Sequence, residues 1–396
     1  MTTKPEAPPP SRIAAIDAYR GFVMLLMMGE VLHLAAVAKE HSDKSFWKFL
    51  AWHQSHVPWT GLTLHDLIQP SFSFLVGISL PFSLASRQSL GTSRGWLIAR
   101  AAWRGFLLAA LGIFLRSMGK PQTNFTFDDT LTQIGLGYLP LFLVALTTVR
   151  TQWIFFSVIV VGYGLAFGLY PVASDFDYTA VGVPGDWPHH FTGWQAHWNK
   201  NSNLAWAFDT WWMNLFPREK PFTHSGGGYA TLSFIPTLAT MILGLIAGGW
   251  LKQEGTSVGK ILQFVTAGVV GLTLGWLIAW LGICPSVKRI WTPTWVVVSG
   301  GWCFLLLALL YGTIDAVQRT AWSFPLRVIG MNSIVAYCIA HGCEKFIMDS
   351  CRTHFGPKCF QLLGTVYEPV VAGLVVLVVF WVFLYWLYRQ RLFVRI

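Results

Sequence analysis

The densest group of polar side chains in the sequence lies in residues 52–70, which read WHQSHVPWTGLTLHDLIQP. The stretch contains three histidines and one aspartate, His53, His56, His65 and Asp66. Histidine is the side chain best suited to moving a proton near neutral pH, so this run could carry general acid–base chemistry. Trp52 and Trp59 could shape an apolar wall or stack on a sugar ring. These residue types together indicate a catalytic or sugar-binding site.

Two other interpretations of this run stay open. The histidines could belong to an interfacial loop in which they simply suit the headgroup zone of a membrane. A zinc site is the second alternative, since His53 and His56 are three residues apart. Both histidines precede Pro58, however, and are expected in irregular chain. The sequence has no CxxC motif, and we expect neither structural zinc nor a catalytic metal.

Ionisable residues inside apolar segments are informative because a charge in lipid is costly. Asp17 and Arg20 are three residues apart and could form a structural ion pair. Glu30 and His33 have the same spacing, which puts them on one face of a helix. Glu30 is expected on the same side of the membrane as His56 and could hold that histidine in the right tautomer. An interfacial pair without a catalytic role is the alternative.

Polar residues in two later regions could contribute to the same site. Asn332 and His341 lie in an apolar segment and could face a cavity, where Asn332 could stabilise an oxyanion. They could instead bind neighbouring helices together. Asp209 precedes the glycine-rich run SGGGYAT at 225–231, which permits a close approach to a ligand or marks a flexible entry to a helix. No GK[ST] follows, so the run is not a P-loop.

The elements that must position these side chains are transmembrane helices. Hydrophobic residues make up 54% of the chain and charged residues only 12%, whereas an ordinary soluble domain is about 25% charged. This composition predicts an all-α, polytopic transmembrane helical bundle with no room for an ordinary soluble catalytic domain. Ten apolar segments are expected to cross the membrane: 14–37, 66–86, 98–118, 129–149, 153–173, 229–251, 260–281, 295–317, 324–348 and 367–388.

The distribution of charge predicts the orientation. Lys and Arg residues of the short loops are more frequent on the N-terminal side, which favours cytoplasmic termini. Residues 1–12 are expected to form a disordered cytoplasmic tail, and 13–396 a single multipass domain with a long external loop at 174–228. Arg100 and Arg104 share one helix face on the inner side and could bind phosphates. The basic residues are otherwise dispersed, so no nucleic-acid partner is expected.

Two further patterns concern packing. Gly244 and Gly248 form a GxxxG motif, which favours close contact between helices. Cys351 and Cys359 lie in the last external loop and could form a disulfide if that side is oxidising. A disulfide there would close a short loop and stabilise it modestly.

Four segments together resemble a known family. DAYRG at 17–21 resembles the D-x-x-R-G opening of the heparan-α-glucosaminide N-acetyltransferase family. Residues 56–77 resemble its H-x-x-W-x-G-L-x-x-x-D-L-x-x-P-x-F-x-F-x-x-G run, and this is the most specific match. FIPTLATMILGLIAG at 234–248 and GMNSIVAY at 330–337 match later blocks. The resemblance covers nearly the whole membrane domain.

The resemblance implies an acetyltransferase that takes the acetyl group of cytosolic acetyl-CoA and delivers it to an amino sugar or other glycan across the membrane. The family's catalytic histidine falls on His56. With such a donor, Arg100 and Arg104 could meet the CoA phosphates, and the ordinary positive-inside bias is the alternative explanation of these two arginines. Residues expected to bind the acceptor are Trp52, Trp59, Asp66, Asp209 and His341. This chain has Glu30 in the neighbourhood where the family has Asn, and its family L-Q-R-I block at 131–134 lacks the Arg. The similar long loop of bacterial relatives favours a bacterial inner membrane.

Two functions of other classes remain as alternatives. A transporter or flippase for a sugar-containing or small polar substrate would need a polar cavity but no thioester. A membrane scaffold or sensor could bind a glycan through its outer loop and would survive the loss of His56. Binding of acetyl-CoA separates the enzyme from both, and a homodimer is left open in each case.

Overall fold

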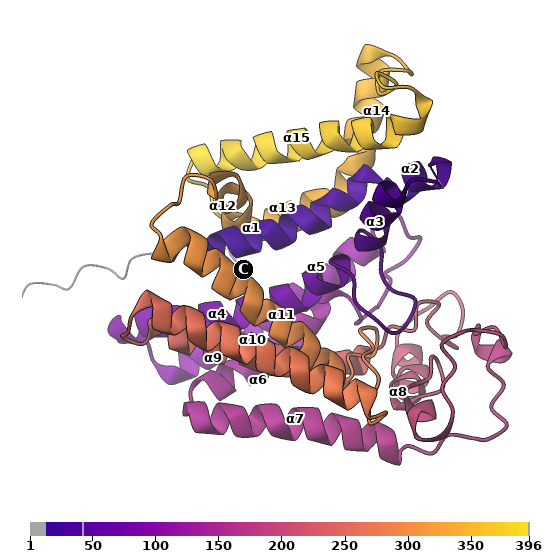
Figure 1. The fold of residues 1–396 in the computed structure, drawn as a ribbon, viewed down its shortest axis with the longest axis vertical. Coiled ribbons are helices and arrows are strands. Elements are labelled where there is room, and N and C mark those ends of the chain that lie inside the picture. The colour runs from indigo at the N-terminus through magenta and orange to yellow at the C-terminus, as the bar shows by residue number, and fades with distance from the viewer. Residues whose placement is uncertain (1–12, 42, 395–396) are drawn as a thin grey trace, which may run out of the picture.

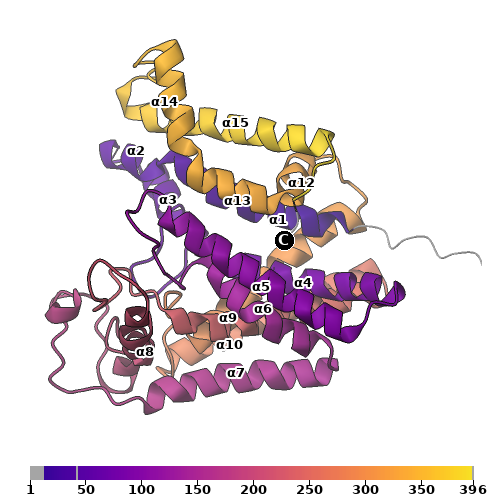
Figure 2. The ribbon, with the colours of Figure 1, turned by 180° about the vertical axis from the view of Figure 1, so that it is seen from behind.

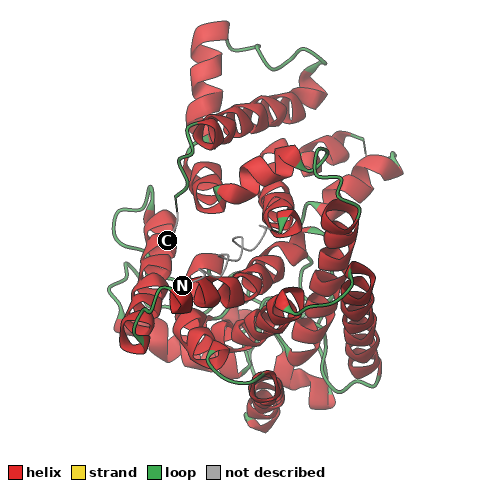
Figure 3. Ribbon diagram, turned by 90° about the vertical axis from the view of Figure 1, so that its left-hand side faces the viewer, coloured by secondary structure: helices red, strands yellow, loops and turns green. Residues whose placement is uncertain are grey.

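The computed structural model describes residues 13–41 and 43–394, so the tail expected at 1–12 lies outside the described residues. Within these ranges the chain forms helices and loops without a strand, as the all-α prediction requires. The long helices run side by side (Figure 1), with α7 (Val149–Leu169) along one edge of the bundle and α15 (Glu368–Arg389) along the other. Figure 2 shows the same order from behind, and Figure 3 views the bundle with most long helices foreshortened.

Seven helices of the described residues are long and apolar enough to cross a membrane. They comprise α7, α15, α4 (Ile68–Ser89), α5 (Arg94–Ser117), α9 (Phe234–Lys252), α10 (Ser257–Trp280) and α11 (Pro293–Leu310), some with short flanking turns. An eighth span arises if α1 (Ala14–Met28), the turn to Leu32 and α2 (Leu34–Glu40) count as one segment bent by 46°. The chain is an integral membrane protein, but ten crossings are not confirmed, because α6 (Thr130–Ala145) and α13 (Ser333–Gly342) are shorter.

The segments 14–37 and 324–348, each expected as one helix, are both broken. His33 has a φ of 45°, a left-handed conformation that ends the short helical turn after α1. In the second segment, Asn332 separates α12 (Phe324–Met331) from α13. Its side-chain Nδ2 donates to the Leu392 carbonyl at 3.0 Å, and its Oδ1 accepts from the Val394 N–H at 3.1 Å. The break is therefore fixed by the end of the chain, which folds back against it, and α14 (Glu344–Phe355) continues beyond α13.

Glycines allow α4 and α9 to pack with their backbones in contact. A Cβ atom on Gly244 would overlap the carbonyl of Phe74, and one on Gly248 would overlap the carbonyl of Ile78. The close packing predicted from the GxxxG motif is confirmed. This contact matters for the site, because α4 carries the histidine-containing run at its N-terminal end.

Replacing Gly244 with leucine should push α4 and α9 apart and lower the free energy of unfolding by about 2 kcal/mol, the usual cost of overpacking. Thermal unfolding of the purified protein in detergent measures the effect. Gly249→Leu is the matched control, since a Cβ there meets no heavy atom within 4 Å. Equal loss of stability in both variants would contradict the packing role of Gly244.

The long loop folds over the end of the bundle that also bears α2 and α3 (Ser45–His53) (Figure 1). It contains α8 (Leu204–Trp212) and an apolar cluster in which Trp59 and Trp198 are fully buried. All six cysteines of the chain lie in described residues and are free thiols, so the disulfide expected between Cys351 and Cys359 is not formed. Both of these side chains pack instead against an apolar cluster around Phe360.

Candidate active site

His56 and Asp66 are brought into contact by the turn of chain between α3 and α4. His56 Nδ1 lies 2.8 Å from Oδ1 of Asp66. The Asp66 side chain is completely buried, whereas that of His56 is 38% exposed. A buried carboxylate on one ring nitrogen orients the imidazole and leaves the other nitrogen available for proton transfer.

The Asp66 carboxylate accepts hydrogen bonds that hold the surrounding chain in place. Oδ2 of Asp66 accepts the Thr63 hydroxyl at 2.9 Å and the Thr63 N–H at 3.1 Å. The Val57 N–H points to the same oxygen at 3.4 Å, and the Asp66 N–H returns a bond to the Thr63 hydroxyl at 3.3 Å. These bonds close the irregular segment before α4 and fix the position of His56 at its start.

A lysine distant in sequence completes the cluster. Lys288 lies in the loop between α10 and α11 and is buried, with Nζ 3.1 Å from Asp66 Oδ1 and 3.0 Å from His56 Nδ1. Nδ1 cannot donate to the carboxylate and accept from the ammonium at the same time. Because a carboxylate is the stronger acceptor, we infer that His56 donates from Nδ1 to Asp66 and that Lys288 also donates to Asp66. The lone pair of His56 is then on Nε2.

The surroundings keep His56 neutral. Partial burial lowers the pKa of His56 below its usual value of 6.5; the hydrogen bond to Asp66 opposes this shift, and the charge of Lys288 adds to it. Burial also lowers the pKa of Lys288, with Asp66 opposing. A neutral imidazole near pH 7 has the protonation state that a general base needs.

A second histidine–carboxylate pair lies against the first. His65 Nε2 is 2.9 Å from Oε1 of Glu30, and the rings of His65 and His56 have centroids 4.6 Å apart. His65 is buried, whereas the Glu30 side chain is 59% exposed. No three His, Cys, Asp or Glu side chains of the described ranges are arranged to hold a metal ion.

A cavity of about 590 Å³ opens beside these pairs; we call it the outer cavity. Its lining is mostly polar: Met27, Glu30, His56, His65, Ile68, Gln69, Arg116, Asn124, Thr126, Asp128, Asp129, Thr130, Tyr229, Lys288, Tyr337 and His341. His341 stacks on Tyr337 with ring centroids 4.3 Å apart. The volume lies within the range of about 300–1,000 Å³ that is usual for small-molecule sites.

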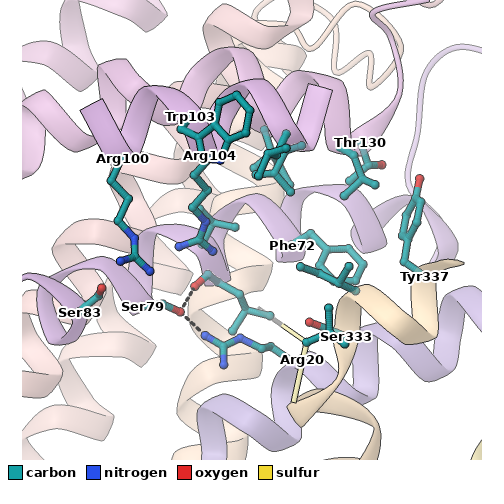
Figure 4. A pocket seen from close by; sticks show the side chains of 18 of the residues that line it. Arg20, Phe72, Ser79, Ser83, Arg100, Trp103, Arg104, Thr130, Ser333 and Tyr337 are labelled. Carbon is teal, nitrogen blue, oxygen red and sulfur yellow. Dashed lines mark hydrogen bonds between the residues drawn. The ribbon is translucent and has the colours of Figure 1, made fainter. Parts of the chain in front are cut away.

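A second cavity, of about 930 Å³, lies toward the end of the bundle where α1 and α5 begin; we call it the inner cavity. Among the described residues, its lining contains four arginines, Arg20, Arg87, Arg100 and Arg104, and no acidic residue. Arg20 pairs with Asp17 at 3.2 Å, as predicted, and bonds to Ser79. Figure 4 shows Arg100 and Arg104 projecting into the cavity from α5, with Arg20 across from them.

The other three arginines of the inner cavity lack an acidic partner in the part of the chain that the structure describes. Within the described residues, Arg87, Arg100 and Arg104 have no ion-pair partner. Arg104 donates to the Tyr138 hydroxyl at 2.9 Å, but its Nε is buried without a hydrogen-bond partner. Guanidinium groups gathered without acids favour a ligand with several negative charges, and phosphate groups match their geometry.

The two cavities meet at Thr130 and Tyr337, which line both. The Tyr337 hydroxyl donates to Oδ2 of Asp129 at 3.0 Å, and Arg116 Nε donates to the same oxygen at 3.2 Å. In Figure 4, Thr130 and Tyr337 lie at the end of the inner cavity away from Arg100. A ligand held by the arginines would extend toward the histidines past these two side chains.

The structure brings several residues selected from the sequence to these cavities. His56, Glu30 and His341 line the outer cavity, and Asp66 lies directly behind His56. Arg100 and Arg104 line the inner cavity. The expected link between Glu30 and His56 is wrong, however: Glu30 bonds to His65, and Asp66 is the carboxylate that holds His56.

Four other selected residues lie elsewhere. Asn332 lines neither cavity, because its amide binds the backbone at the C-terminal end. Trp52 lies on α3, half exposed and outside both cavities. Trp59 is buried and donates from Nε1 to the Trp198 carbonyl at 3.1 Å, which ties the long loop to the histidine run. Asp209 accepts the Thr231 N–H at 2.9 Å away from the outer cavity, and burial raises its pKa to about 6.

Sequence reasoning missed Lys288 and the junction formed by Thr130 and Tyr337. Lys288 is separated from Asp66 by 222 positions, and no spacing rule connects them. Its only signal is a pair of adjacent cations, Lys288 and Arg289, in the short loop CPSVKRIW. Tyr337 lies in an apolar segment, where a tyrosine is ordinarily an interfacial residue.

Comparison with known proteins agrees with the motifs found in the sequence. The chain is 24% identical over 428 residues to human (Homo sapiens) heparan-alpha-glucosaminide N-acetyltransferase, covering 98% of this chain and 60% of the human protein. It is also 24% identical over 370 residues to the mouse (Mus musculus) protein of the same name, covering 83% of this chain and 53% of the relative. The chain thus spans little more than half the length of these relatives. No protein-family model matches it. The predicted resemblance is confirmed.

Proposed function

We propose that this protein is a membrane-embedded acyltransferase that moves an acetyl group from cytosolic acetyl-CoA to an amino sugar or other glycan on the external side. The observation that carries the proposal is the meeting of an arginine-lined cavity and a histidine-lined cavity at Thr130 and Tyr337. A polyanionic donor and a polar acceptor can approach from opposite ends of the bundle and react at the junction. The similarity to two N-acetyltransferases supports this reaction type.

The inner cavity is the proposed donor site. Coenzyme A carries several phosphate charges at one end and the thioester at the other. With its phosphates against Arg87, Arg100 and Arg104, the pantetheine chain would run toward Thr130 and Tyr337. The thioester would then reach the outer cavity without the nucleotide crossing the membrane.

His56 is the proposed general base. Its Nε2 takes a proton from the attacking nitrogen and gives it to the departing thiolate, and the same atom would carry the acetyl group if transfer occurs in two steps. Asp66 positions the ring, and partial burial together with the charge of Lys288 keeps it neutral. Because Asn332 is committed to the backbone near the C-terminus, the Thr130 hydroxyl is the proposed donor to the oxyanion.

The orientation follows from the same assignment. The arginine-lined cavity faces the cytosol, so both termini are cytoplasmic and residues 174–228 are external. This agrees with the bias of Lys and Arg in the short loops. The proposed location is a bacterial inner membrane, where cytosolic acetyl-CoA and an exported glycan meet across one bilayer.

Incubation of the purified protein with radiolabelled acetyl-CoA and a panel of amino sugars tests the proposal. We expect label in an N-acetylated sugar and release of free CoA. A protein that binds no acetyl-CoA, but moves unmodified sugar across the membrane of proteoliposomes, would be a transporter. A protein that binds glycan without either activity would be a scaffold or sensor.

A further inference from the structure

We infer that Glu30 is the residue that recognises the acceptor as a cation, through its ammonium group. The inference rests on the proposed function and deepens it, since it restricts the acceptor to a primary amine that is charged when it binds. The contacts of Glu30 and the charges of the two cavities lead to this conclusion.

Glu30 and Asp128 are the two carboxylates of the outer cavity that each keep one oxygen without a hydrogen-bond partner among the described residues, and of the two Glu30 is the one bonded to His65. Of the three carboxylates in that lining, Asp129 already accepts from Arg116 and Tyr337, and Asp128 accepts from the Thr126 hydroxyl. Glu30 uses Oε1 for His65 at 2.9 Å, and no described residue bonds to its Oε2. An ammonium group offers three donors and no acceptor, which matches an unused carboxylate oxygen.

The location of Glu30 suits the chemistry. The His65 ring that holds Glu30 lies against the His56 ring in a tilted arrangement, and Glu30 and the proposed base both line the outer cavity. His56 Nε2 has no hydrogen-bond partner among the described residues and is free to meet the same nitrogen. A cation held by Glu30 therefore lies beside the base and on the external side of Tyr337.

The inner cavity is positively charged and the outer cavity is richer in carboxylates, as recognition of a cation in the outer cavity requires. The described lining of the inner cavity has four arginines and no acid, and would repel an ammonium ion. The outer cavity has three carboxylates against Arg116 and Lys288, and Asp66 lies behind it. A cationic acceptor is therefore favoured in the outer cavity and excluded from the donor side.

The proton balance assigns Glu30 a binding role and leaves the base role to His56. The bound ammonium first releases one proton to the outer water, which the 59% exposed Glu30 side chain adjoins. The neutral amine then attacks the thioester carbonyl, and its nitrogen becomes cationic again as the C–N bond forms. His56 Nε2 removes that second proton, the C–S bond breaks, and the thiolate accepts the proton. The sum is R–NH₃⁺ and acetyl-S-CoA giving the amide, CoA-SH and H⁺.

Steady-state kinetics of Glu30→Gln with glucosamine as acceptor tests the inference. We expect the KM for glucosamine to rise about tenfold or more, because a charged hydrogen bond is lost, while the KM for acetyl-CoA stays unchanged. Glu30→Asp keeps the charge and should recover most of the affinity. Glu344→Gln is the matched control, since Glu344 forms an equivalent 2.9 Å pair with His33 outside the outer cavity.

A competition experiment separates recognition of charge from a structural role. Glucose has a hydroxyl in place of the amine, so in the wild type it should compete only weakly against glucosamine. The inhibition constant of glucose should be the same for the wild type and Glu30→Gln. An unchanged glucosamine KM in Glu30→Gln, or equal affinities for glucose and glucosamine in the wild type, would overturn the inference while leaving acetyl transfer intact. If Glu30→Gln fails to fold, the wild-type competition decides alone. Absence of transfer in the wild type would instead refute the proposed function.

Discussion

Replacing His56 with alanine should reduce acetyl transfer by a factor of about 10² or more, the usual contribution of a general base. Binding of acetyl-CoA should be nearly unchanged, because His56 lines the outer cavity and the arginines line the inner one. Initial rates with labelled acetyl-CoA, together with equilibrium binding of CoA, measure the two effects separately. The combination of lost turnover and retained binding distinguishes a catalytic role from a folding defect.

The pH dependence of kcat should identify the same group. A base acts in its neutral form, which is present above its pKa, so activity should fall as the pH drops through the pKa of His56. Burial lowers that pKa below the usual value of 6.5, which places the acid limb of the profile below about 6.5. The measurement is kcat at saturating acceptor over a pH range of about 5 to 8, which extends on both sides of 6.5.

His53→Ala is the control for both experiments. His53 belongs to the same run, but it lines neither cavity, and its Nδ1 accepts the Leu64 N–H at 3.2 Å. Its loss should cost much less activity than the loss of His56. Near-normal turnover of His56→Ala would show that the base is another residue.

The helices could be predicted from the sequence because few backbone conformations are stable in lipid. Every backbone group of a spanning segment must be satisfied within the segment, so a long apolar run is a helix. The predicted helices are wrong where a side chain bonds to the backbone and interrupts an apolar segment. Asn332 interrupts an apolar segment because its side chain binds the backbone of residues about sixty positions away, and nothing local in GMNSIVAY requires this.

Within the site, contacts between residues close in the sequence could be predicted, whereas contacts between distant residues could not. His56 and Asp66 lie in one short run, so their types and proximity could be noticed together. Glu30 and His33 were placed on one face by helical spacing, but the helix ends before His33, whose backbone is left-handed. His33 consequently pairs with Glu344 at 2.9 Å, and Glu30 meets His65. Contacts between distant segments, including that of Lys288 with Asp66, are set by helix packing and have no local signature.

The largest effect on donor binding is expected from the double variant Arg100→Gln, Arg104→Gln. Each arginine is one turn from the other on α5, and each can make charged hydrogen bonds worth about 1.5–3 kcal/mol to phosphate. Loss of both should raise the dissociation constant of acetyl-CoA by a factor of about 10² or more. Rates at saturating donor should change far less, because these arginines line the inner cavity and His56 lines the outer one.

The control for charge alone is Arg94→Gln, Arg150→Gln. Both arginines are exposed, both lie in the first turn of a helix, and neither lines the inner or the outer cavity. This pair removes the same net charge, so it reports any general electrostatic attraction of the anionic donor, which salt would also screen. Isothermal titration with CoA compares the two double variants with the wild type. An equal loss of affinity in both would mean that Arg100 and Arg104 act only through the overall field, and an unchanged affinity in the first would place the CoA phosphates elsewhere.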